Sequence, residues 1–365
     1  MAASLIFYNP RKIASLDRNL YPDINRFSKF FSLYDNSVAL VDRTGTVRTP
    51  IRSHLLSPIP AVRPFSKTYE ELCDERAREI LQRADELSLP IYTMWSGGID
   101  STLVLVSLLK HATETQKKNI TVLMSDESIN EYPRFYREHI YGKLHTESSV
   151  RFPELIGTNL MLVGGEHNDQ LFGSDVVGLM ISRYGEAIIH EPVRRDRLLE
   201  FFTEKSGNAE NVDFYLDIFE KVRASAPVEI STNFQYLWWL NFALKWQPVY
   251  TRMLIRVRPR NVANITPEYL RTRYVQFYST DDFQLWSILN LDKKIQNTWV
   301  SYKFTAKEVI YRYTKDADYR DNKTKRGSLF NLLVQQDMYN FVDDSFTFYK
   351  EMEPEEYYLP ENDFA

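Results

Sequence analysis

Short apolar runs alternate with amphipathic segments between residues 66 and 163, and this alternation predicts a parallel sheet. Apolar runs of strand length occupy residues 91–95, 120–124 and 160–163, and each ends in small or polar residues. The segments around them have helical spacing of apolar positions, at residues 66–88, 101–112 and 131–141. Strands that alternate with helices form parallel sheets covered by helices. We therefore expect an α/β protein with a doubly wound parallel sheet.

Outside this region the pattern of apolar and polar residues is different. Residues 1–65 mix short apolar runs with turn residues, which predicts a small N-terminal appendage. Residues 176–340 are mainly helical in pattern and rich in aromatic residues, which indicates core packing. Residues 341–365 carry eight acidic residues and one lysine, as expected of a solvated acidic tail. We expect one main domain over residues 66–340.

Composition narrows the class of protein. The chain has 365 residues and a formal net charge of −4, which argues against a basic nucleic-acid coat or an anionic-membrane binder. Its one cysteine, Cys73, cannot form an internal disulfide or a zinc cluster, so any metal should be held by oxygen or nitrogen atoms. No apolar stretch is long enough to span a bilayer, and the start lacks the features of a signal peptide. We expect a soluble, cytoplasmic protein.

The strongest chemical signal follows the predicted strand at residues 91–95. The sequence there reads Ser96-Gly97-Gly98-Ile99-Asp100-Ser101-Thr102. Glycines let a phosphate approach backbone amides, and the start of a helix favours anions. The hydroxyls of Ser96, Ser101 and Thr102 can donate further hydrogen bonds. A carboxylate at Asp100 would repel phosphate unless a magnesium ion lies between them. The structural alternative is an ordinary capped helix start.

This string resembles the SGGxDS loop of the PP-loop ATP pyrophosphatases. No Walker-type Gly-x-x-x-x-Gly-Lys occurs in the chain. The resemblance implies an enzyme that splits ATP between its α and β phosphates, releases pyrophosphate and leaves an adenylated substrate. The residues that it implies for ATP binding are Ser96, Gly97, Gly98, Asp100, Ser101, Thr102 and, beside the adenine, Met124.

A second segment indicates which of the PP-loop families the chain resembles. It reads Gly164-Gly165-Glu166-His167-Asn168-Asp169-Gln170-Leu171-Phe172-Gly173 and is similar to the SGEGxDExFGG segment of asparagine synthetases and β-lactam synthetases. The resemblance implies that Asp169 holds magnesium together with Asp100, and that Glu166 contacts the substrate and deprotonates an attacking amine. A capping pair at a helix start is the alternative interpretation of Glu166 and Asp169. His167 and Gln170 depart from the family, which has glycine and a second acid there.

A third, looser match lies near residues 321–327. The family has a Lys-x-Gly loop whose lysine stabilises the transition state that forms pyrophosphate, and Lys325 is two residues before Gly327. A cation there would neutralise charge on the leaving group. Lys323 and Arg326 are rival candidates, and a solvated basic turn is the structural alternative.

The resemblance covers about residues 90–175 closely, as the nucleotide core, and residues 275–330 loosely. It implies a ligase that uses Mg²⁺ and ATP to adenylate a carboxylate and then joins it to an amine. Too few residues precede Ser96 for the glutaminase domain of asparagine synthetases. We therefore expect free small-molecule carboxylate and amine substrates, or an amine supplied by a separate subunit.

Two alternative functions stay open. Six arginines within residues 251–273 predict a surface for a nucleic acid, as in PP-loop enzymes that modify RNA: Arg252, Arg256, Arg258, Arg260, Arg271 and Arg273. The departures at His167 and Gln170 are also compatible with a nucleotide-binding scaffold that has no turnover.

Overall fold

The chain folds into two compact units. The computed structural model describes residues 5–7, 19–21, 23–24, 26–27, 30, 33, 40–206, 212–324, 340–342 and 347–349. The sheet unit comprises residues 63–172 and 256–336, and the helical unit comprises residues 1–62, 173–255 and 337–365. Residues 173–255 therefore group with the N-terminal segment.

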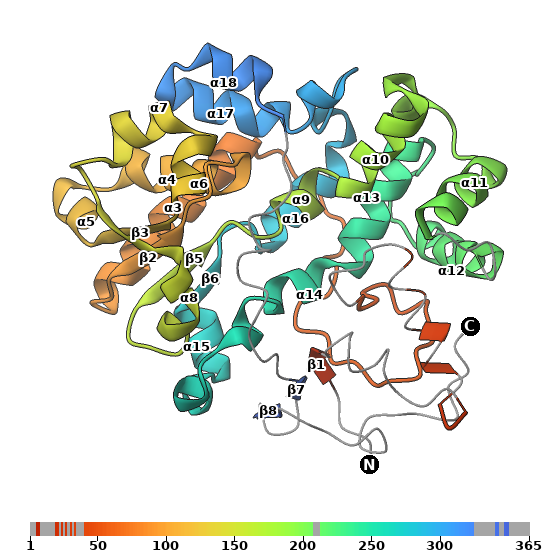
Figure 1. Ribbon diagram of the computed structural model, residues 1–365, viewed down its shortest axis with the longest axis horizontal. Helices are drawn as coiled ribbons and strands as arrows, with labels where there is room; N and C mark the ends of the chain where they lie inside the picture. The colour runs from red at the N-terminus through yellow and green to blue at the C-terminus, as the bar shows by residue number, and fades with distance from the viewer. Residues whose placement is uncertain are drawn as a thin grey trace. The chain divides into compact units, whose positions relative to one another are not determined.

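A five-stranded parallel sheet forms the centre of the sheet unit (Figure 1). Its strands are β2 (Ile91–Met94), β3 (Ile120–Met124), β4 (His145–Ser148), β5 (Met161–Gly164) and β6 (Tyr274–Gln276). The spatial order is β4-β3-β2-β5-β6. The chain thus runs outward from β2 in one direction, returns to β5 on the other side of β2, and continues to β6. The α/β class and the parallel sheet are confirmed.

Three strands were expected from the sequence and two were not. The runs at residues 91–95, 120–124 and 160–163 form β2, β3 and β5 to within one residue at each end. The edge strand β4 is polar and mostly exposed, so it lacks an apolar run. The other edge strand, β6, has only three residues, which is too short to show the alternation of apolar and polar residues that identifies a strand.

Helices surround the sheet and follow the expected pattern with one interruption. Those of the sheet unit are α3 (Tyr69–Glu86), α4 (Ile99–His111), α5 (Glu114–Lys118), α6 (Asp126–Glu131), α7 (Pro133–Phe135), the π-helix η1 (Tyr136–Ile140), α8 (Phe152–Leu155), α9 (Asn168–Phe172), α15 (Pro267–Thr272), α16 (Asp281–Leu289), α17 (Phe304–Thr314) and α18 (Ala317–Asn322). Short 3₁₀ turns are η2 (Ser149–Arg151), η5 (Pro259–Asn264), η6 (Leu291–Lys293) and η7 (Trp299–Ser301). The helix expected at residues 131–141 is broken, because Pro133 has no N–H to continue α6.

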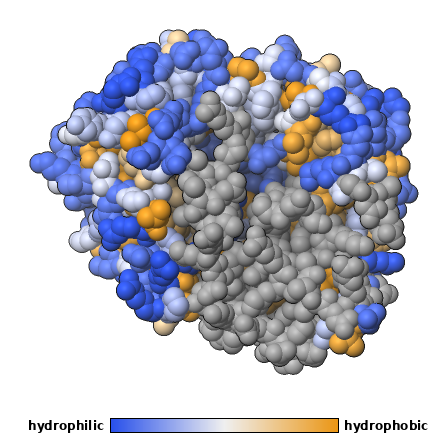
Figure 2. Space-filling model, in the orientation of Figure 1, coloured by the Kyte–Doolittle hydropathy of each residue, from blue (hydrophilic) through white to orange (hydrophobic). Residues whose placement is uncertain are grey.

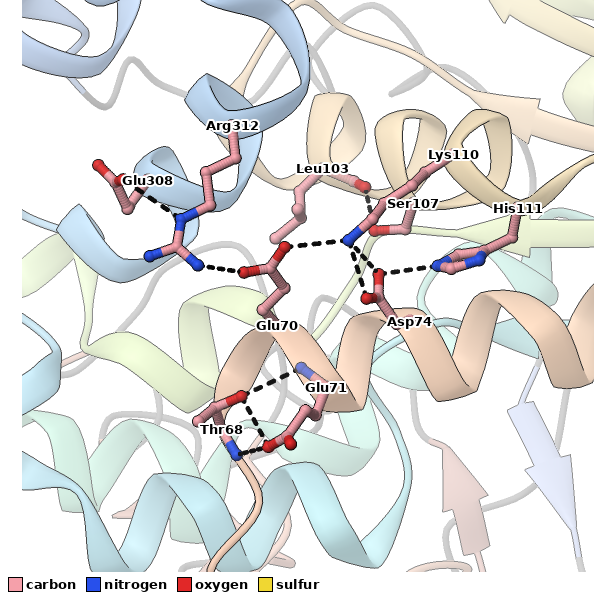
Figure 3. A network of polar contacts seen from close by, with 10 residues as sticks. All are labelled: Thr68, Glu70, Glu71, Asp74, Leu103, Ser107, Lys110, His111, Glu308 and Arg312. Carbon is pink, nitrogen blue, oxygen red and sulfur yellow. Dashed lines mark hydrogen bonds and ion pairs between the residues drawn. The ribbon is translucent and has the colours of Figure 1, made fainter.

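Polar contacts join α3 to α4 and α17 (Figure 3). Glu70 of α3 accepts hydrogen bonds from Lys110 of α4 at 3.0 Å and from Arg312 of α17 at 2.5 Å. Asp74, one turn further along α3, binds Lys110 at 2.8 Å and His111 at 2.9 Å. Partly exposed ion pairs contribute little free energy, so these contacts mainly fix how the three helices align.

The helical unit is built around the buried helix α13. Its elements are β1 (Leu5–Phe7), α10 (Asp175–Tyr184), the 3₁₀ turn η3 (Glu186–His190), α11 (Arg195–Ser206), α12 (Val212–Ala224), α13 (Asn233–Leu244), α14 (Trp246–Thr251), β7 (Asn340–Val342) and β8 (Thr347–Tyr349), while the turn η4 (Leu254–Arg256) bridges the boundary between the units. Every residue of α13 except Gln235 is buried, as expected of a helix that is apolar on all sides. Strands β1, β7 and β8 form a small antiparallel sheet.

The outer surface of α17 and α18 is mostly hydrophilic (Figure 2). Their apolar side chains, Val309 and Ile310 among them, face inward and are buried. Within the part of the chain that the structure describes, no helix combines the length and the apolar character needed to cross a bilayer.

The cap of α3 gives a first prediction. Thr68 and Glu71 form a capping box: the Thr68 hydroxyl accepts the Glu71 amide N–H, and the Glu71 carboxylate accepts the Thr68 amide N–H at 2.7 Å. We expect Thr68→Ala to lower the free energy of unfolding by about 1 kcal/mol, because the amide of Glu71 loses its acceptor. Urea denaturation measures this loss. The exposed Ser66→Ala is the control, and an equal loss in both variants would contradict the role of the cap.

Candidate active site

The loop between β2 and α4 can be made only with glycine at its centre. Gly97 has φ of +74°, and a Cβ added there would lie 2.6 Å from the carbonyl oxygen of Ser128 and 2.7 Å from Cβ of Glu131. Gly98 caps α4 and has no side chain to cover the amides of the first turn. The loop therefore leaves the start of a 13-residue helix open, which suits an anion.

The loop hydroxyls divide into two groups. Ser96 and Ser101 lie with their Oγ atoms 3.0 Å apart, and the Ser101 Oγ also accepts the backbone N–H of Ser96. These two hydroxyls lie at the loop itself. Thr102 is fully buried, and its hydroxyl accepts the indole N–H of Trp95 at 3.0 Å. Thr102 therefore anchors the end of β2 rather than presenting its hydroxyl at the loop.

The loop after β5 packs directly on the start of α4. A Cβ added to Gly165 would lie 3.3 Å from the carbonyl carbon of Asp100 and from the amide nitrogen of Ser101, so a side chain there would crowd the helix start. His167 has φ of +76°, a conformation that favours glycine. The departure from the family glycine thus falls where the backbone still has the conformation of a glycine.

Two carboxylates, one in the first turn of α4 and one in the first turn of α9, converge on a buried lysine. The Lys303 ammonium lies 2.5 Å from Oδ1 of Asp100 and 2.6 Å from Oδ1 of Asp169. The Lys303 side chain is 1% exposed, whereas the two aspartates are about a quarter exposed or more. Lys303 has φ of +59° and immediately precedes α17. Sequence reasoning missed its role, because it lies about 200 residues from Asp100 and belongs to no recognised motif.

Buried polar groups fix the position of Asp100. Asn168 donates to Oδ1 of Asp100 at 2.6 Å and accepts the hydroxyl hydrogen of Tyr69 at 2.5 Å. The hydroxyl of Tyr278 donates to the backbone carbonyl of Asp100 at 2.8 Å. Burial raises the pKa of Tyr69 and of Tyr278 well above the ordinary value, so both remain neutral donors. These contacts hold the Asp100 carboxylate in one orientation.

The carboxylates of Asp100 and Asp169 fit a magnesium ion that is carried by a phosphate substrate. Mg²⁺ in such sites uses one or two carboxylates and completes its shell with phosphate oxygens and water. The two aspartates reach a common cation, Lys303, so they lie close enough to share one ion. Within the described ranges, no group of three or more His, Cys, Asp or Glu residues could hold a metal without such a substrate.

Helices α17 and α18 support this site from one side. The hydroxyl of Tyr319 donates to the carbonyl of Gly97 at 3.2 Å, and Lys323 forms an ion pair with Glu131. The Lys307 ammonium donates to the backbone carbonyls of Val300 and, at 3.2 Å, Lys323. Lys307 therefore ties the segment before Lys303 to the end of α18. Lys325 lies outside the described residues, and its role stays a prediction.

The remaining predicted residues have different surroundings. Glu166 is half-buried in the loop after β5, directly after Gly165. Met124 is buried at the end of β3. Gln170 is also buried, so the position where the family has its second acid points into the interior here. The roles of Glu166 and Met124 stay predictions.

The arginine-rich segment does not form one exposed stretch. Arg256 is buried, and Arg258 lies 3.5 Å from Glu154. Arg260 and Arg271 are exposed, but the segment is divided among η4, η5 and α15. Arg256 is therefore not available to a basic surface, whereas the other five arginines of the segment are partly or fully exposed.

Comparison with known proteins adds no assignment. The sequence matches no model of a known protein family, and it has no significant match among curated proteins.

The conformation of Gly97 gives a second prediction. We expect Gly97→Ala to lower the free energy of unfolding by about 3 kcal/mol, because a strained φ and a backbone clash add together. Gly142 has a similar φ of +68° with nothing near its Cβ position, so Gly142→Ala should cost only about 1 kcal/mol. Urea denaturation of both variants separates the two effects. Equal losses would show that the contacts with Ser128 and Glu131 do not constrain the loop.

Lys307 gives a third prediction, on pH. Burial lowers the pKa of Lys307 from 10.5 to about 8, partly opposed by Asp321. Between these two values the unfolded chain binds more protons than the folded one, so the free energy of unfolding should rise with pH, by up to about 3 kcal/mol. Lys307→Met should remove this rise between pH 8 and 10.5. Lys118→Met, at an exposed site, is the control, and an unchanged pH profile in Lys307→Met would contradict the assignment.

Proposed function

We propose that the protein is an ATP-dependent ligase of the PP-loop ATP pyrophosphatase class, similar to the synthetase part of asparagine synthetases. It adenylates a carboxylate with release of pyrophosphate and then forms an amide with an amine. One observation carries the proposal: the loops after β2 and β5 meet, and the aspartates of the helices that follow them, Asp100 and Asp169, converge on the Lys303 ammonium.

The topology of the sheet supports this location. The strand order reverses between β2 and β5, and in open parallel sheets ligands bind beyond the carboxyl ends of the strands at such a reversal. Strand crossovers are almost always right-handed, so crossovers that run in opposite directions from β2 and β5 place their helices on opposite faces. This supports a doubly wound sheet.

In the proposed first step, a substrate carboxylate oxygen attacks the α-phosphorus of ATP. The bond from that phosphorus to the bridging oxygen breaks, and pyrophosphate leaves with the electron pair. Ser96, Ser101 and the amides at the start of α4 hold the phosphates, and the Lys303 ammonium offsets negative charge as it builds up on the leaving group. Bound Mg²⁺, held by Asp100 and Asp169, would supply further charge neutralisation.

In the second step, the amine nitrogen attacks the carbonyl carbon of the adenylate. Glu166 orients the amine and accepts its proton, the bond from carbon to the AMP oxygen breaks, and the amide and AMP are released. Glu166 fits this role because its loop follows β5 at the same sheet edge as the β2 loop. The carboxylate and the amine are small molecules of unassigned identity.

The alternative functions receive less support. Of the arginines that would contact a nucleic acid, Arg256 is buried. A scaffold without turnover would follow from the departures at His167 and Gln170. These departures leave Asp100, Asp169 and Lys303 together, so the charged centre of the site persists.

Analysis of nucleotide products tests the proposal. With Mg-ATP and separate pools of amino acids with ammonium, tRNA and DNA, we expect AMP and pyrophosphate with the amino-acid pool. Asp100→Asn should reduce the rate by about 100-fold or more, because it removes a charge from the phosphate and metal site. Asp292→Asn, at an exposed position, is the matched control and should keep the rate.

Each alternative outcome has its own meaning. ADP and phosphate in place of AMP and pyrophosphate would overturn the proposed cleavage of ATP. Stimulation by tRNA or DNA alone would favour modification of a nucleic acid. Binding of ATP without turnover by any pool would favour the scaffold.

A further inference from the structure

A buried amide at the end of β6 has an acceptor atom without a donor. Gln276 is 3% exposed, and its Oε1 atom has no hydrogen-bond partner among the described residues. Buried polar atoms are normally paired, so an unpaired one points to a bound group that the protein recognises. Gln247, a buried glutamine of the helical unit, shows the usual arrangement: its amide oxygen accepts from Leu56, and its amide nitrogen donates to Ile6 and His54.

Hydrogen bonds hold the backbone of Gln276, and Gly164 leaves space beside its side-chain amide. Gln276 pairs with Gly164 of β5, and a Cβ added to Gly164 would lie 2.3 Å from Oε1 of Gln276. A side chain at position 164 would therefore displace the Gln276 amide from its position. The backbone carbonyl of Gln276 accepts hydrogen bonds from Ser279 at 2.8 Å and from Arg76 at 3.4 Å, which hold the root of the side chain.

The position of the amide connects it with the proposed reaction. Gly164 is the last residue of β5, and the loop Gly165-Glu166 follows it directly. Gln276 is the last residue of β6, and Glu166 lies two residues beyond the end of the neighbouring strand β5, so both are rooted at the carboxyl edge of the sheet. Both groups accept hydrogen bonds, so together they suit a ligand with several N–H bonds and repel a carboxylate.

We propose that Gln276 binds the amine nucleophile, ammonia or a small primary amine, by accepting one of its N–H hydrogens. This inference rests on the function proposed above. One N–H stays bonded to Oε1 of Gln276 while another proton leaves to Glu166 as the C–N bond forms. Gln276 thus determines specificity for the amine and takes no part in the cleavage of ATP.

Two substitutions of Gln276 test amine binding separately from adenylation. Gln276→Met keeps the length of the side chain and removes the acceptor, so we expect KM for ammonium chloride and for hydroxylamine to rise about tenfold or more. Gln276→Glu keeps the acceptor and loses the amide donor, and its KM for both amines should stay near that of the unsubstituted protein. ATP–pyrophosphate exchange, which needs only the first step, should be unchanged in Gln276→Met.

Gln247→Met is the matched control for a buried glutamine. It should lower the melting temperature because it breaks three hydrogen bonds, with no effect on KM for the amines, whereas Gln276→Met should keep the melting temperature.

An unchanged amine KM in Gln276→Met would overturn the inference and leave the proposed function standing. Absence of pyrophosphate exchange with every pool in the unsubstituted protein would overturn both proposals.

Discussion

The Lys303 ammonium between Asp100 and Asp169 is the interaction on which the candidate site depends. Two carboxylates that share one partner repel each other, and the repulsion is strong where protein excludes water. The lysine offsets it, but a buried charge is itself costly unless it is paired on all sides. Each of the three charges therefore requires the other two. Because the aspartates lie in the first turns of α4 and α9, directly after the loops that follow β2 and β5, this requirement holds together two segments that are far apart in the sequence.

Glycines let these loops come close enough for the charges to meet. Gly97 adopts a conformation and a position that no side chain could share, and Gly165 lies against the first residues of α4. The backbone conformation of these loops thus sets the shape of the site, whichever functional side chains it carries. The helices α17 and α18 then close around it, with Tyr319 on the loop carbonyl and Lys307 holding the segment before Lys303. Much of the sheet unit serves to fix this small region.

The same geometry explains how the chain accommodates its two departures from the motif that it resembles. His167 takes the left-handed backbone conformation that glycine would take, at a cost in local strain. Gln170 points into the interior, where a charged acid would need a partner. Neither residue removes a member of the charged group of Asp100, Asp169 and Lys303. The departures change the surroundings of the site more than its charges.

The sequence alone determined the parts of this protein that depend on neighbours along the chain. The strands β2, β3 and β5, the helix starts after them and the two glycine loops were predictable, because apolar period and turn chemistry act over a few residues. Tertiary structure decided the rest. Lys303, Asn168 and Gln276 reach the loops from distant segments, and the edge strands β4 and β6 are defined by pairing rather than by pattern. Burial also removed Arg256 from the expected basic surface, because exposure depends on what packs above a residue and not on its spacing.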